Sequence, residues 1–181
     1  MEADAAIATV TAWLDRTGIE VARARAEDTA HEYHGVPASA LSPAPAFATW
    51  RTALHEAAHA VAAVIQGARL RRVVLRSGFS AAEIEESSVA ARAITQLAAP
   101  VLELLAGASA RRQCELACSY DISAARCALS DAPEVTHRTA ATMAAAIVVS
   151  KLSAIERVAA CLAAVGELSG HEVAALCGAT P

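Results

Sequence analysis

The segment between Pro45 and Gly67 constrains the fold of this chain more than any other. It contains no proline and no glycine, and its apolar residues recur at helical spacing over 47–66. Such spacing places apolar side chains on one face of an α-helix, and a glycine directly after it is typical of a helix C-terminus. The sequence therefore predicts a long helix over 47–66 with one face in the core.

Composition extends this prediction to most of the chain. Hydrophobic residues make up 55% of the 181 residues but aromatic residues only 3%, so alanine and aliphatic residues must fill the core. Alanine has the highest helix propensity of all residues, and this length suits one domain with a real core. We therefore predict a mainly α fold. Residues 47–181 are expected to form a single helical domain, preceded by an N-terminal helix (3–28) and a proline-rich loop within residues 1–46.

Only one segment of the chain has the pattern of a β-strand. Residues 70–76 are short, partly alternating and rich in valine, which predicts a short β element there. Residues 80–118 have helical spacing instead. Because proline disrupts a helix interior, Pro100 is expected to divide that segment into two helices, over about 81–98 and 100–117.

Start signals for three further helices follow. One helix is expected to begin within residues 119–121. Asp131, as a cap with Pro133 in the first turn, predicts the start of a long helix. Ser169 and Glu172 form a capping-box pattern ahead of a short final helix.

Charge and apolar patterning argue against nucleic acid and membranes as partners. The net charge of −4 provides no basic surface for phosphates. Charged residues interrupt every apolar stretch before about 18 residues, so no membrane-spanning helix is predicted. The acidic start is unlike a signal peptide, and five cysteines, an odd number, fit free thiols. We expect a cytoplasmic protein in which Cys114 and Cys118 are small core residues.

The motif His55-Glu56-Ala57-Ala58-His59 lies inside the predicted helix 47–66. Residues four apart share a helix face, so the two histidines project together and can bind one Zn²⁺. The carboxylate of Glu56 then lies beside the metal. In this hypothesis Glu56 is the general base, taking a proton from a water at the metal and delivering it to the leaving amine.

Two histidines leave the ligand set incomplete, because catalytic zinc usually takes three protein ligands. Spacing alone does not decide which downstream residue is the third. The candidates are the following acidic residues and histidines: Glu83, Glu85, Glu86, Glu103, Glu115, Asp121, His137 and His171.

The segments around this motif resemble the peptidase domain of the FtsH family, the ATP-dependent zinc proteases. Residues 52–61 are similar to that family's zinc helix, and residues 72–78 to the strand that follows it. Leu104-Leu105-Ala106-Gly107 resembles its Leu-Ala-Gly helix. Asp121-Ile122 falls where the family has the acidic residue that is its third zinc ligand. The resemblance covers roughly residues 47–177, in the family's order.

This resemblance implies that His55, His59 and Asp121 bind zinc and that Glu56 is the catalytic base. The implied activity is that of a zinc metalloendopeptidase acting on peptides or unfolded protein segments. On this assignment, Glu103→Ala should leave zinc content unchanged. The chain has no G-x-x-x-x-G-K-[ST] motif, so it is not expected to bind ATP. A homo-oligomer is compatible with these features.

Two other functions fit the same residues. One is a catalytically inactive module of the same fold, which keeps zinc for structure or docks on a protein partner. The missing ATPase motivates it, as does Arg111, which replaces a glutamate common in the family. The other is a different His-Glu-x-x-His hydrolase, such as the ImmA/IrrE type that cleaves a repressor. The strand over 72–78 and the Leu-Ala-Gly segment favour the FtsH-like interpretation.

Overall fold

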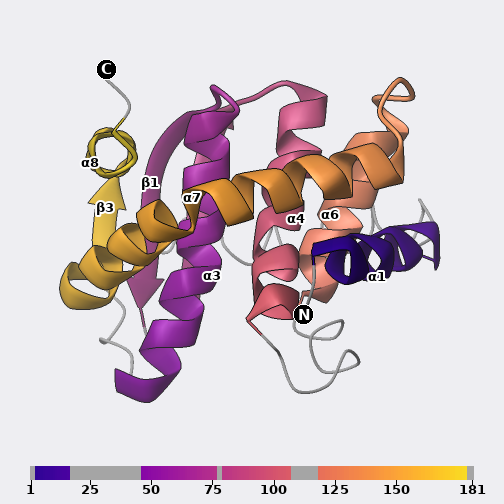
Figure 1. Ribbon diagram of the computed structural model, residues 1–181. Coiled ribbons are helices and arrows are strands. Elements are labelled where there is room, and N and C mark those ends of the chain that lie inside the picture. The colour runs from indigo at the N-terminus through magenta and orange to yellow at the C-terminus, as the bar shows by residue number, and fades with distance from the viewer. Residues whose placement is uncertain (1–2, 17–45, 77–78, 107–117, 179–181) are drawn as a thin grey trace.

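The computed structural model describes residues 3–16, 46–76, 79–106 and 118–178 (Figure 1). Over these residues the protein is mainly α-helical, with six helices and a small three-stranded antiparallel sheet, which confirms the prediction of a mainly α fold. The helices are α1 (Ala3–Arg16), α3 (Ala46–Ile65), α4 (Val89–Leu105), α6 (Ser119–Ser130), α7 (His137–Val165) and α8 (Gly170–Leu176). The strands are β1 (Arg69–Arg76), β2 (Phe79–Glu86) and β3 (Glu167–Ser169).

Helix α3 forms the centre of the core, as its apolar pattern predicts. The long helix α7 runs across α3 and α4 and packs against both (Figure 1). The buried face of α3 consists mostly of small side chains with no exposed surface: Ala53, Ala57, Ala58, Ala60, Val61 and Ala62. Because small side chains let helices approach closely, an alanine-rich chain reaches the packing density of a protein interior with few aromatic residues.

The end of α3 follows from Gly67. The Gly67 N–H donates to the Val64 carbonyl (3.1 Å), and the Ala68 N–H donates to the Ala63 carbonyl (2.9 Å). These two bonds define a Schellman motif, which requires a left-handed residue, and Gly67 has φ of 69°. The chain then turns directly into β1.

Helix α4 continues through Pro100, so the prediction of two helices divided there is wrong. Proline in a helix interior costs about 3 kcal/mol. Burial of one face of α4 offsets that cost, since each fully buried large aliphatic side chain contributes about 1.5–3 kcal/mol. The buried aliphatic residues that flank Pro100 are Ile94, Leu97, Val101 and Leu104. Residues 107–117, where the second helix was expected to continue, lie outside the described residues.

The sheet is larger than the single β element predicted. Strand β1 lies in the middle, with β2 and β3 antiparallel on either side of it. The expected helix over residues 81–86 is therefore a strand. Pairing with β1 decides this, because Arg72 of β1 donates to both carboxylate oxygens of Glu83 on β2, at 2.9 and 2.7 Å. The local spacing of apolar residues carries no information about such cross-strand partners, so it cannot predict this strand.

Helix α7 begins later than predicted. Its N-cap is Thr136, whose side chain accepts a hydrogen bond from the Thr139 N–H (3.1 Å). Asp131 instead caps the C-terminus of α6, with its N–H donating to the Ala128 carbonyl. The Asp131 and Pro133 signal thus marks the connection between the two helices, and the threonine supplies the N-cap.

The predicted capping box of the last helix is confirmed. The Ser169 side chain accepts from the Glu172 N–H (3.3 Å), and the Glu172 carboxylate accepts from the Ser169 N–H (2.7 Å). Because Ser169 is also the last residue of β3, the sheet leads directly into α8.

Helix α1 matches the beginning of the predicted N-terminal helix, and residues 17–45 lie outside the described residues. It packs against α7, α4 and α6, and Val10, Trp13 and Leu14 are buried in the common core. The division of the chain at residue 46 stays a prediction. Among the described helices, none is long and apolar enough to cross a membrane.

Candidate metal centre

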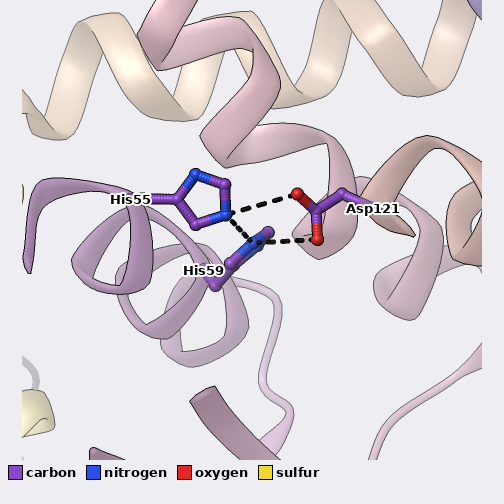
Figure 2. Close-up of side chains that lie close together, drawn as sticks. All are labelled: His55, His59 and Asp121. Atoms are coloured by element: carbon purple, nitrogen blue, oxygen red, sulfur yellow. Dashed lines mark hydrogen bonds and ion pairs between the residues drawn. The ribbon is translucent and has the colours of Figure 1, made fainter. Parts of the chain in front are cut away.

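Three side chains from two helices converge inside the protein (Figure 2). His55 and His59 come from α3, and Asp121 comes from the first turn of α6. The two histidine Nε2 atoms lie 3.3 Å apart. His55 Nε2 is 3.3 Å from Asp121 Oδ2, and His59 Nε2 is 3.4 Å from Asp121 Oδ1. The three residues named from the sequence as metal ligands are therefore adjacent in space.

Hydrogen bonds on the far side of each ring determine where the imidazole protons lie. His59 Nδ1 donates to the Thr95 carbonyl (2.8 Å), since a carbonyl oxygen only accepts. His55 Nδ1 donates to Glu103 Oε1 (3.0 Å), because the oxygens of an ionised carboxylate likewise only accept. In neutral imidazoles both Nε2 atoms then carry lone pairs, and these face each other and the Asp121 carboxylate.

This convergence of acceptors fits a zinc ion. Acceptors so close together must be neutralised by a cation or by protons on the rings. Tetrahedral zinc with bonds of about 2.0–2.1 Å places its ligand atoms about 3.3–3.4 Å apart. The two Nε2 atoms lie 3.3 Å apart, and they lie 3.3 and 3.4 Å from different oxygens of Asp121. The spacing, the lone-pair directions and the donor types of His55, His59 and Asp121 are those of a group that could hold a metal ion such as zinc.

In the absence of a metal, protons on the imidazoles balance the carboxylate. Burial lowers the pKa of His55, but the hydrogen bonds to Asp121 and Glu103 outweigh burial and raise this pKa well above 6.5. Burial also lowers the pKa of His59, yet the charge of Asp121 raises it above its ordinary value. Burial would raise the pKa of Asp121, whereas the adjacent imidazoles hold it well below 3.8. The metal-free cluster is thus a buried ion pair.

Exposure differs among the residues of the centre. The side chains of His59 and Asp121 are 8% and 9% exposed, whereas the His55 side chain is 17% exposed. Glu56 is also buried, and its charge favours the protonated form of both imidazoles. Within the described part of the chain, no hydrogen bond or ion pair occupies the Glu56 carboxylate. Glu56, the expected base, therefore lies beside the trio of His55, His59 and Asp121, and no other described side chain binds its carboxylate.

Most of the other candidate ligands lie elsewhere. Four of them are paired outside the trio or face solvent: Glu83, Glu85, His137 and His171. The two glutamates pair with arginines of β1, and His137 Nδ1 donates to Asp15 of α1 (2.6 Å). Glu115 lies outside the described residues, as does the side chain of Glu86.

Glu103 of α4 touches the trio without belonging to it. Its Oε1 accepts from His55, and its Oε2 accepts from Arg51 at 2.6 Å. Among the residues that the sequence offers as a third ligand, Glu103 therefore contacts His55 but is not one of the three members of the trio. The sequence does not predict the contact of Thr95 with His59, because the backbone carbonyl makes it and no side-chain signal marks it.

Cys118 forms a second grouping with His55 and Glu103. One ligand atom from each of these residues lies within 4.8 Å of the others. Cys118 is fully buried and directly precedes α6; its expected helical neighbour, Cys114, lies outside the described residues. Glu103 already accepts two hydrogen bonds, so this grouping fits a metal less well than the trio does.

No protein-family model, curated protein or solved structure matches this chain. The likeness to the FtsH peptidase domain therefore rests on the quoted motifs alone. The fold and the site together define a mainly α protein with a buried His-His-Asp group able to hold a metal ion.

Proposed function

We propose that the protein is a zinc-dependent metallopeptidase that hydrolyses peptide bonds. His55, His59 and Asp121 would bind the metal, and Glu56 would act as the general base. The observation that carries this proposal is a set of 3.3–3.4 Å separations. They join the two Nε2 atoms of His55 and His59 to each other, and each Nε2 to a different oxygen of the Asp121 carboxylate. Glu56 follows the first ligand directly on α3.

The chemistry divides between the metal and the side chains around it. Bound zinc supplies Lewis acidity and lowers the pKa of a coordinated water to about 7. Glu56 accepts a proton from the attacking water and passes it to the amine nitrogen as the C–N bond breaks. The water oxygen remains in the new carboxyl group, so one peptide bond and one water yield an acid and an amine. Thr95 keeps His59 oriented throughout.

The local charge also supports a divalent cation. Asp121, Glu56 and Glu103 place three carboxylates around the two imidazoles, and Arg51 pairs with Glu103. With neutral histidines, the group lacks two positive charges. Buried charge is stable only when it is compensated, and one Zn²⁺ supplies the missing amount.

A second candidate is a catalytically inactive zinc-binding module of the same fold. The low exposure of His59 and Asp121 favours it, because structural zinc sites are closed by four protein ligands. Cys118 groups with His55 and Glu103 and not with His59 and Asp121, so it would have to move toward the trio to close the fourth position. The two candidates therefore differ in whether the fourth position is open to water.

One experiment tests the proposal against this alternative. The zinc-loaded parent and the Glu56→Gln variant are both assayed on unstructured peptides and on a labelled unfolded protein. The zinc content of both proteins is measured. The proposal expects one zinc per chain in both proteins and cleavage only by the parent. Equal cleavage by both proteins would contradict Glu56 as the base. Tight zinc binding without cleavage, with a sulfur ligand in the X-ray absorption spectrum, would establish the second candidate instead.

A further inference from the structure

The two histidines of the metal centre are held by different kinds of acceptor. His59 donates to a neutral backbone carbonyl, that of Thr95, whereas His55 donates to the charged carboxylate of Glu103. Both acceptors belong to α4, so one helix orients both rings. A carboxylate that accepts from Nδ1 makes the opposite nitrogen, Nε2, a more basic metal ligand than a carbonyl acceptor does. The reason is that the carboxylate stabilises positive charge on the ring.

Glu103 is itself fixed on both sides. Its side chain is 10% exposed, and it lies between His55 and Arg51, which is one helical turn before His55 on α3. Each oxygen of this carboxylate therefore accepts a hydrogen bond, Oε1 from the His55 ring and Oε2 from the Arg51 guanidinium.

We propose that Glu103 is a positioning residue of the metal centre. By accepting the Nδ1 proton of His55, it selects the tautomer whose Nε2 lone pair faces His59 and Asp121, and it holds the ring in that orientation. This inference rests on the metal site of the proposed function, and it does not depend on peptide cleavage. It replaces the expectation that Glu103→Ala leaves zinc binding unchanged.

Two simpler roles for Glu103 make different predictions. As a partner of Arg51 alone, Glu103 would stabilise the contact between α3 and α4, and loss of either residue would have the same effect. As a direct ligand, together with His55 and Cys118, it would place sulfur and a second carboxylate on the metal. The test therefore needs a variant that keeps the acceptor, a variant that removes only the Arg51 pair, and a spectrum that reports the ligands.

The test measures zinc affinity of the full chain by competition with a chromophoric chelator. Loss of an outer-shell partner typically weakens metal binding about 10–100-fold, and we expect this for Glu103→Ala. Glu103→Gln keeps an oxygen that accepts from His55 and should recover most of the affinity. Arg51→Ala, the matched control, should weaken zinc binding clearly less than Glu103→Ala does, because the bond from His55 to Glu103 remains. Metal-free melting temperatures of the variants identify any loss of folding.

The spectrum of the Co²⁺-substituted parent completes the test. We expect four-coordinate cobalt without a sulfur charge-transfer band, and the same band shape in Glu103→Gln. Unchanged zinc affinity in both Glu103 variants would overturn the proposal, as would equal weakening by Arg51→Ala or a cobalt–sulfur band in the parent. A parent that binds zinc but cuts no peptide would overturn only the proposed peptidase activity. A parent that binds no zinc would overturn both.

Discussion

The Nε2 atoms of His55 and His59 lie 3.3 Å apart and face each other. The rings meet edge to face, with centroids 4.9 Å apart and planes at 79°. Since each Nδ1 donates on the opposite side of its ring, neither Nε2 carries a proton in the neutral form. This arrangement is unfavourable until a cation or protons occupy the space between the rings and Asp121.

Alanine in place of His55, His59 or Asp121 should abolish stoichiometric zinc binding. Each change removes one of the three proposed ligands. The affinity for zinc should therefore fall by more than about 100-fold, the upper end of the loss that is typical of outer-shell changes. Plasma mass spectrometry of dialysed protein measures the zinc content. His171→Ala, at an exposed position of α8, is the control and should keep full zinc. Full zinc in Asp121→Ala would show that the third ligand is misassigned.

Glu56→Gln should lower peptide cleavage while leaving zinc content unchanged. The amide keeps the shape of the side chain but cannot accept the water proton, and loss of general-base catalysis typically costs about 10²–10⁴-fold in rate. Initial rates on a fluorogenic peptide, normalised to bound zinc, provide the measurement. Glu156→Gln, at an exposed position of α7, controls for the change in net charge and should cleave at the parent rate.

The metal-free protein should be most stable at mildly acidic pH. The pKa values of His55 and His59 are raised above 6.5, so their contribution is complete below about pH 6.5 and is lost as pH rises through the raised values. The pKa of Asp121 is lowered below 3.8, so its contribution is present above that pH and is lost as pH falls. Urea unfolding in the presence of a chelator measures the profile. Equal stability at pH 5.5 and pH 8.5 would contradict the buried ion pair.

Zinc binding should release protons at neutral pH. With both histidine pKa values raised, the metal-free cluster holds protons that the metal must displace. We expect release of about two protons per zinc near pH 6.5, falling at higher pH. Isothermal titration calorimetry in buffers of different ionisation enthalpy counts them. Binding enthalpies that do not vary with the buffer would contradict this prediction.

Gly170→Ala should destabilise the junction between β3 and α8. A Cβ at this position would lie 1.8 Å from the Leu70 carbonyl oxygen, so the backbone of one segment must shift. Overpacking of this kind typically costs about 1–3 kcal/mol, which thermal or urea unfolding detects. Gly178→Ala is the matched control, because its added methyl meets nothing within 4 Å but its φ of 72° remains strained. A loss no larger than that of the control would show that the junction accommodates a side chain.

The structure corrects the sequence-based predictions where distant segments meet. Residues 81–86 have an acceptable helical pattern, yet they form β2 because β1 provides hydrogen bonds and arginine partners. Pro100 is an ordinary helix breaker, yet α4 continues because its flanking residues are buried. In both cases tertiary packing outweighs local propensity, and propensity scales do not include the free energy of that packing.

The sequence by itself determined the helix that carries the motif and the common face of His55 and His59. These properties depend only on residues three to seven positions apart, and the geometry of one helix settles them. The contacts of His55 with Asp121 and Glu103 depend on how α3, α4 and α6 pack. So does the contact of His59 with the Thr95 carbonyl, which the identity of residue 95 does not encode. Only the tertiary structure decided these, because the spacing and burial of a metal centre arise from side chains that meet across helices.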